Sequence, residues 1–140
     1  MQLFVNGRSE EAEAPLDATL LTVLREHLGH TEVKEGCSTG TCGACLVRVD
    51  GALRNACLIL AAQAEGASVE TVTSLPPSWS ETFARRGAVQ CGLCSPGMLM
   101  AASRLKPGAG EQEVREALEG NLCRCTGYVK IVEAVKEIVQ

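Results

Sequence analysis

The sequence predicts an α+β protein, in which a small sheet with one helix packed across it is followed by four short helices. Three observations predict this fold. Strand and hairpin signals, together with a single helical segment, fill the first half of the chain. The adjacent prolines Pro76 and Pro77 then interrupt it, because proline cannot continue a helix or a central strand. Helix caps and helical periodicity follow. We therefore expect two domains, residues 1–75 and residues 76–140.

The composition excludes several classes of protein. A chain of 140 residues can form one domain or two small ones, and 46% hydrophobic content is normal for a globular protein. A net charge of −4 without a basic run argues against a nucleic-acid surface. The N-terminus lacks the cationic flank of a signal peptide, and no apolar run approaches the roughly 18 residues of a membrane span. We therefore expect a cytoplasmic protein whose eight cysteines bind metal in a reducing compartment.

The first half is expected to contain four strands and one helix. Asn6-Gly7 predicts a two-residue hairpin, because both central positions of a type I′ turn need a positive φ. Leucines recurring from Leu20 form one apolar helical face, which Asp17 or Thr19 can cap. His30 follows this helix, and its placement near the helix C-terminus is a better explanation than metal binding. The expected strands are 1–5, 8–14, 46–50 and 68–72, the expected helix is 20–28, and 54–60 is a short apolar segment that returns Cys57 towards the loop before the third strand.

The second half is expected to be all-helical. Ser78-Trp79-Ser80-Glu81 matches a capping box at the start of the first helix. Ser95 precedes Pro96 as an N-cap precedes a proline at the first helical position. Met98 and Met100 are expected in the core and not in contact with a cofactor. The expected helices are 79–86, 98–105, 111–119 and one that begins near Thr126 and presents Tyr128, Ile131, Val132, Val135, Ile138 and Val139 on one face.

The most informative pattern is C-x4-C-x2-C at Cys37, Cys42 and Cys45. It matches the spacing of plant-type ferredoxins, whose fourth cysteine comes later in the chain, as Cys57 does here. A short loop can supply three thiolates to two irons and two sulfides only by wrapping around them, and its glycines permit that conformation. Zinc sites usually have paired C-x2-4-C hooks, and disulfides belong to oxidising compartments. A [2Fe–2S] cluster is therefore favoured over a zinc loop and a disulfide loop.

The second half carries the other four cysteines, in Cys91-Gly-Leu-Cys94 and Cys123-Arg-Cys125. Each pair precedes an expected helix, where the helix dipole and free N–H groups stabilise a thiolate. Cysteines one residue apart point the same way only in an extended backbone, so 122–126 should be a short extended turn. Spacing alone leaves a structural zinc site open, and the first motif in the same chain favours a second iron–sulfur centre. Arg124 either offsets the charge of that centre or is an ordinary exposed arginine.

Three separated motifs together resemble those of a known protein family. They are Gly36-Cys-Ser-Thr-Gly-Thr-Cys-Gly-Ala-Cys45, Gln90-Cys-Gly-Leu-Cys-Ser-Pro-Gly-Met98 and Asn121-Leu-Cys-Arg-Cys-Thr-Gly-Tyr128. In this order they closely resemble the iron–sulfur subunit of molybdenum-containing hydroxylases, the xanthine oxidase, aldehyde oxidoreductase and aerobic carbon monoxide dehydrogenase group. The resemblance covers nearly the whole chain. Its departures, such as Leu93 and Ser95 at positions where phenylalanine and threonine are common, remove no cysteine and leave the substrate undecided.

The resemblance implies a ferredoxin-like β-grasp domain with one [2Fe–2S] cluster, followed by a four-helix domain with a second. It implies two separate partners, a large subunit that holds molybdopterin, usually as the cytosine dinucleotide in bacteria, and a medium subunit that binds FAD. A dimer of such heterotrimers is the implied assembly. The substrate, an aldehyde, a purine, an N-heteroaromatic compound, CO or an aryl-CoA, would bind to the large subunit, so no catalytic residue is expected on this chain. The implied role is the relay of single electrons between molybdopterin and FAD.

The cysteines separate into two ligand sets, because each group lies on one side of the two prolines. We predict that one cluster is held by Cys37, Cys42, Cys45 and Cys57, and the other by Cys91, Cys94, Cys123 and Cys125. In the family, the residue matching Cys125 approaches the pterin and the glutamine matching Gln90 lies beside it, which implies that the second cluster is nearer molybdenum. The alternative for Gln90 is an ordinary solvated residue before a turn.

Two other functions stay open from the sequence. One is a zinc-stabilised interaction module with no redox role, which would be colourless where an iron–sulfur protein is red-brown. The other is a free-standing soluble ferredoxin, which has no evident need of the helical half. A stable heteromeric complex on purification would decide against the free-standing ferredoxin.

Overall fold

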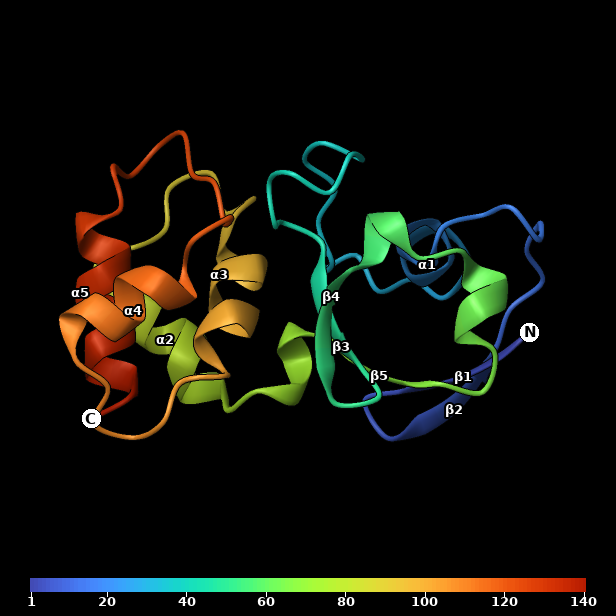
Figure 1. Ribbon diagram of the computed structural model, residues 1–140, viewed down its shortest axis with the longest axis horizontal. Coiled ribbons are helices and arrows are strands. Elements are labelled where there is room, and N and C mark those ends of the chain that lie inside the picture. Colours follow the sequence, from blue (N-terminus) through green and yellow to red (C-terminus); the bar gives the residue numbers. More distant parts are fainter.

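The computed structural model describes all of residues 1–140 and has five strands and five helices. The molecule is elongated, with the two termini at opposite ends (Figure 1). We call residues 1–75 the sheet half and residues 76–140 the helical half. Each half encloses its own cluster of buried apolar side chains, one drawn from residues 3–69 and the other from residues 83–139. No helix is both long and apolar enough to cross a membrane.

The strands form one mixed sheet in the order β2-β1-β5-β3-β4, with β1 and β5 parallel and the other neighbours antiparallel. The predicted hairpin turn is confirmed, since Asn6 and Gly7 have φ values of 49° and 80°. A second turn of the same kind, at Asp50 and Gly51, leads into a strand that the sequence did not predict. The strands are β1 (Gln2–Val5), β2 (Arg8–Glu11), β3 (Leu46–Val49), β4 (Ala52–Asn55) and β5 (Ser68–Glu70).

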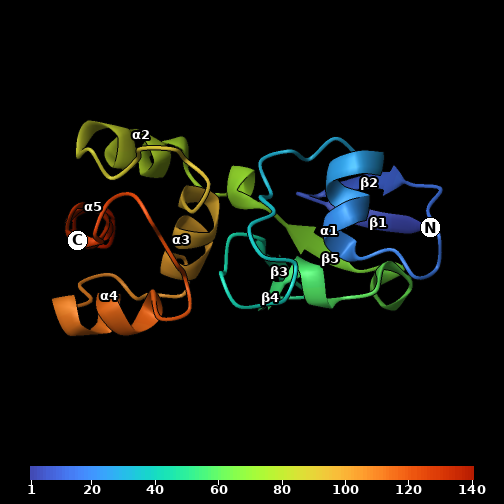
Figure 2. The ribbon, with the colours of Figure 1, turned by 90° about the horizontal axis from the view of Figure 1, so that it is seen from above.

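The helix of the sheet half packs across the sheet (Figure 2). It begins as α1 (Leu20–Thr22), and Thr19 caps it by accepting a hydrogen bond from the N–H of Thr22. It continues as a π-helical turn over Val23–His27. Leu20 and Leu24 are fully buried, as the leucine spacing predicts. The predicted apolar segment 54–60 begins inside β4. A 3₁₀ turn over Ala56–Leu58 follows and carries Cys57 back to the loop before β3.

The helical half contains α2 (Pro77–Arg85), α3 (Ser95–Ala102), α4 (Glu111–Ala117) and α5 (Val129–Ile138). Three predicted starts are wrong by a few residues. The first helix begins at Pro77 instead of Trp79, because proline suits the first position of a helix even though it cannot occupy the interior. Ser95 is the first residue of α3, and Cys94 occupies the N-cap position.

The last helix begins at Val129 and not near Thr126. Gly127 and Tyr128 have φ values of 69° and 72°, which no residue of a right-handed helix can adopt. The backbone from residue 121 to residue 128 is irregular and not helical, and it bends at residues 124–126. The prediction that 122–126 is not helical is therefore confirmed, but the segment bends and is not a simple extended turn. Met98 and Met100 are fully buried, as expected of core residues.

Candidate metal centres

The loop before β3 concentrates hydrogen-bond donors on one sulfur atom. The backbone N–H groups of Thr39, Thr41 and Cys42 point at Sγ of Cys37 from 3.4, 3.3 and 3.4 Å. Hydrogen bonds involving Thr39 and Thr41 lower the pKa of Cys37 from 9.0 to about 5. Several N–H groups converging on one atom make a site for an anion, and a thiolate is the form of cysteine that binds metal. The predicted wrapping of this loop around a negatively charged group therefore fits its geometry.

The other cysteines of the sheet half lie deeper. Burial raises the pKa of Cys45 to about 12, and the side chains of Cys45 and Cys57 are only 3% and 8% exposed. The N–H of Ala56 donates to the carbonyl of Cys45 over 3.2 Å, which holds the 3₁₀ turn with Cys57 against the end of the loop. A buried thiol becomes a thiolate where a nearby positive charge or hydrogen-bond donors stabilise the charged form. A metal centre would supply such a positive charge.

The helical half also contains one cysteine whose pKa is raised by burial and one whose pKa is lowered by hydrogen bonds. Burial raises the pKa of Cys94 to about 12. Burial acts the same way on Cys123, but hydrogen bonds from the hydroxyl and the N–H of Thr126, at 3.1 and 3.5 Å, bring its pKa down to about 7. Cys91 and Cys125 are exposed at the surface.

The eight thiols affect one another's pKa mainly in pairs. After burial and backbone hydrogen bonds, the largest effect of another thiol on a cysteine pKa comes from Cys37 for Cys42, from Cys57 for Cys45, from Cys125 for Cys91 and from Cys123 for Cys94. No three His, Cys, Asp or Glu side chains gather around a single point. Each iron of a [2Fe–2S] cluster takes two thiolates, so paired thiols are compatible with iron–sulfur ligation.

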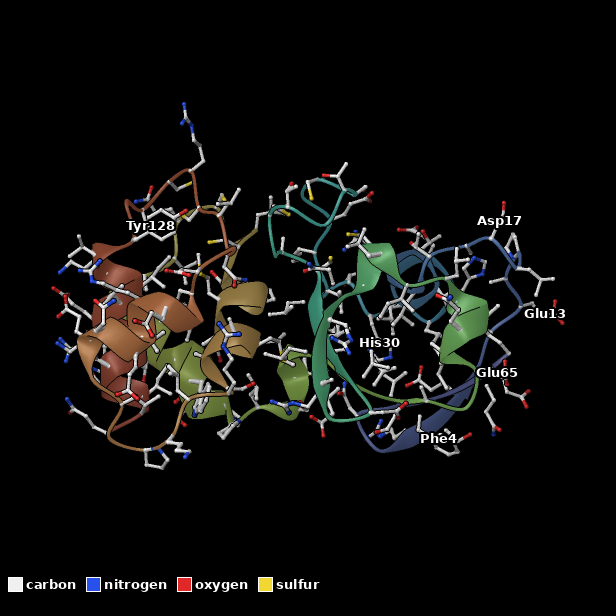
Figure 3. The ribbon with its side chains drawn as sticks, viewed as in Figure 1. Phe4, Glu13, Asp17, His30, Glu65 and Tyr128 are labelled. Atoms are coloured by element: carbon white, nitrogen blue, oxygen red, sulfur yellow. The ribbon has the colours of Figure 1, made fainter.

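A cavity of about 420 Å³ lies between the loops of the two halves. Gly36, Cys42 and Ala44 line it from the sheet half, and all four cysteines of the helical half line it from the other side. Figure 3 shows the sulfur atoms of both halves along this edge of the molecule, with Tyr128 beside them. The phenol oxygen of Tyr128 accepts the N–H of Cys123 over 2.8 Å. The sequence placed Tyr128 on the face of a helix and at the end of the third motif, but its left-handed backbone leaves no signal in the sequence.

The two halves meet directly at these loops. The N–H of Leu122 donates to the carbonyl of Cys42 over 2.9 Å, and the side-chain amide of Asn121 donates to the carbonyl of Gly43 over 3.1 Å. A Cβ placed on Gly97 would stand 2.1 Å from that same carbonyl oxygen, so only glycine fits in this turn of α3. Sequence reasoning missed this junction, although Asn121 and Gly97 lie inside the motifs that carry the cysteines.

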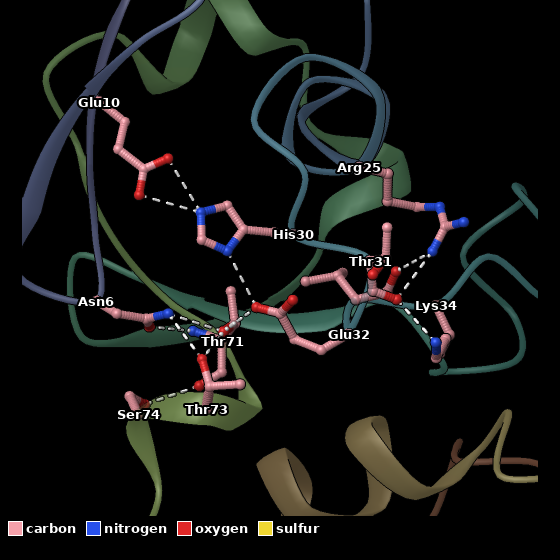
Figure 4. A network of polar contacts seen from close by, with 11 residues as sticks. Asn6, Glu10, Arg25, His30, Thr31, Glu32, Lys34, Thr71, Thr73 and Ser74 are labelled. Carbon is pink, nitrogen blue, oxygen red and sulfur yellow. Dashed lines mark hydrogen bonds and ion pairs between the residues drawn. The ribbon is translucent and has the colours of Figure 1, made fainter.

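Other predicted site residues lie at the rim or away from the centres. Gln90 and Arg124 are exposed beside the second group of cysteines, and Arg124 lines the cavity. His30 lies in a separate polar network (Figure 4), where its two ring nitrogens stand 3.1 Å from carboxylate oxygens of Glu10 and Glu32. The imidazole therefore interacts with two carboxylates and not with the helix end that the sequence indicated.

The fold and the paired thiols define an iron–sulfur protein, and comparison with known proteins agrees. Residues 3–70 match the 2Fe-2S iron-sulfur cluster binding domain, and residues 64–136 match the [2Fe-2S] binding domain. The chain is 46% identical to the nicotine 6-hydroxylase small subunit of Paenarthrobacter nicotinovorans, across 94% of this chain and 84% of that one. It is 41% identical to the xanthine dehydrogenase iron-sulfur-binding subunit of Escherichia coli O157:H7, across 94% and 88% of the two chains.

Solved structures share the fold as well. Quinoline 2-oxidoreductase from Pseudomonas putida 86 matches with a TM-score of 0.88 and 39% identity, over 98% of this chain and 90% of that chain. The aldehyde oxidoreductase of Desulfovibrio desulfuricans ATCC 27774 has the same TM-score and 36% identity, but this chain spans only 16% of it. The chain belongs to the family of iron–sulfur subunits of molybdenum-containing hydroxylases. It is an electron-transfer subunit of a multi-subunit oxidoreductase.

Proposed function

We propose that this chain carries two [2Fe–2S] clusters and relays single electrons between molybdopterin in a large partner subunit and FAD in a medium partner subunit. The observation that carries this proposal is that residues 3–70 and residues 64–136 each match a [2Fe-2S] binding domain, and that each half holds four of the eight free cysteines. The clusters would supply one-electron oxidation and reduction. The chain's own residues bind the irons, direct N–H groups at the thiolates and exclude water from the inner pairs.

The proposed ligand sets follow the two halves. Hereafter the first cysteine set is Cys37, Cys42, Cys45 and Cys57, and the second cysteine set is Cys91, Cys94, Cys123 and Cys125. Two separate apolar cores support the division into a β-grasp domain, residues 1–75, and a four-helix domain, residues 76–140. Each set would then be local to one domain, and the contacts between their loops would bring the clusters close together.

The exposure of the thiols supports an order along the electron path. In the second cysteine set Cys91 and Cys125 are exposed, and the exposed apolar side chains Leu93 and Leu122 flank them. A surface of this kind suits coverage by a partner subunit. We infer that the second cluster faces molybdopterin, with Cys125 and Gln90 nearest to it, and that the first cluster faces FAD. The pterin form proposed is the cytosine dinucleotide, and the assembly proposed is a dimer of heterotrimers.

The substrate class proposed for the complex is an N-heteroaromatic compound. The names of similar proteins support this choice of substrate class, since they contain nicotine, nicotinate, caffeine and xanthine. The substrate would bind to the large subunit, because the cavity of this chain is lined by its cysteines.

The test is the composition of the complex purified through this chain. We expect iron, molybdenum, a pterin dinucleotide and FAD to copurify, with about four irons per copy of this chain because each thiol pair takes one iron. After reduction, two distinct [2Fe–2S] EPR signals should appear. A colourless chain that holds zinc, or a red-brown chain that purifies without partners, would refute the proposal.

A further inference from the structure

One buried side chain joins the loops that carry the two cysteine sets. Asn121 is 6% exposed and its Nδ2 donates to the carbonyl of Gly43, directly after Cys42 in the loop of the sheet half. Its own backbone N–H donates to the carbonyl of Leu118 over 3.0 Å, at the end of α4. Asn121 is therefore anchored in the helical half by its backbone and holds the sheet half by its side chain.

The neighbours of this bond belong to both cysteine sets. Leu122, next to Asn121, donates its N–H to the carbonyl of Cys42, and Cys123 follows directly. Two adjacent hydrogen bonds therefore join residues 42–43 to residues 121–122, between one ligand of each proposed cluster. On the other side of the loop, Gly97 approaches the carbonyl of Gly43 too closely for any side chain. The loop is held between these contacts and has no freedom to slide.

We propose that Asn121 is a positioning residue that fixes the separation of the two clusters and thereby the rate of electron transfer between them. This inference rests on the proposed function, since it needs both clusters to be present. The amide is suited to the role because it presents a donor to a buried carbonyl that would otherwise lack a partner from the helical half. Electron tunnelling weakens steeply with distance, so a small displacement of the loop changes the rate.

The experiment uses the assembled complex reduced with dithionite. Magnetic interaction between two reduced clusters splits their EPR signals and falls with the cube of their separation, so it reports position independently of activity. In Asn121→Ala we expect a weaker and broader splitting, with electron transfer between the clusters slowed several-fold in freeze-quench experiments. The matched control is Asn55→Ala, because Asn55 Nδ2 donates to the carbonyl of Gly40 in the same loop, over 3.3 Å, but from within the sheet half. The control should keep the splitting and the rate.

A second variant keeps the inference testable if Asn121→Ala loses its clusters. Asn121→Asp keeps the size of the side chain and replaces the N–H donor by a carboxylate oxygen that repels the carbonyl of Gly43, so it should weaken the splitting even if Asn121→Ala loses iron. Unchanged splitting in the Asn121 variants, or an equal change in the Asn55 control, would overturn the inference. A single EPR signal in the unaltered complex would instead refute the two-cluster function on which it rests.

Discussion

Replacement of Cys42 by serine should remove one cluster and spare the other. Cys42 suits this purpose, because Cys45 and Cys57 are part of the apolar core of the sheet half and Cys42 is not. The junction should survive, since the hydrogen bond from Leu122 ends on the backbone carbonyl of Cys42 and not on its thiol. The fold and the second cysteine set should therefore be undisturbed.

The size of the effect follows from the thiol pairs. The eight free cysteines would bind about four irons at two thiolates each, so the loss of one cluster should leave about two. Iron analysis, visible absorbance and EPR of the reduced complex measure this loss. Cys91→Ser is the matched variant in the other set, because Cys91 also lies outside the apolar core of its half. Each variant should abolish a different EPR signal. If Cys42→Ser abolished both signals in a chain that still shows native circular dichroism, the assignment of separate ligand sets would be wrong.

Three further predictions concern other parts of the molecule. Tyr128→Phe removes the hydroxyl that accepts the N–H of Cys123, so the reduction potential of the second cluster should shift in a redox titration while that of the first stays constant. Gly97→Ala places a Cβ 2.1 Å from the carbonyl oxygen of Gly43 and should cost about 1–3 kcal/mol, measured as a lower temperature of cluster bleaching; an unchanged temperature would contradict the close approach. Burial raises the pKa of Glu32, but hydrogen bonds, led by one from a threonine hydroxyl, lower it by more, so the net pKa lies below 4.5. The ionised carboxylate therefore stabilises the fold above the unfolded pKa, and this stabilisation is lost as the pH falls through the folded pKa. Glu32→Gln should therefore flatten the acid limb of the stability curve, and an acid limb as steep as in the unaltered chain would count against this role.

The sequence predicts those elements whose signal is local. The turn at Asn6-Gly7 follows from two residues that tolerate a positive φ, and the helix that begins at α1 follows from the spacing of its leucines. Strand β4 escapes prediction because its residues, Ala52–Asn55, are two apolar ones followed by two polar ones and do not alternate. Its pairing with β3 decides its structure, and that partner is visible only in three dimensions.

At the cysteine sites, the sequence predicts what depends on side chains and does not predict what depends on the backbone. The spacing of Cys37, Cys42 and Cys45 identifies a cluster loop because the ligands are side chains with a fixed chemical requirement. The N–H groups that converge on Cys37 are backbone groups, which nearly every residue type has, so the sequence does not indicate them.

The proposed electron path needs a fixed distance between the two cysteine sets, and the junction between the two halves would provide it. A linker with two prolines stiffens the connection but does not set the distance between two loops that lie far apart in the sequence. That distance is set where the carbonyl of Gly43 meets Gly97 and the amide of Asn121. Two of these three residues are glycines, where any larger side chain would push the loops apart. Because the carbonyls of residues 42 and 43 are backbone groups, changes in the surrounding side chains preserve the contact as long as both glycines and the asparagine remain.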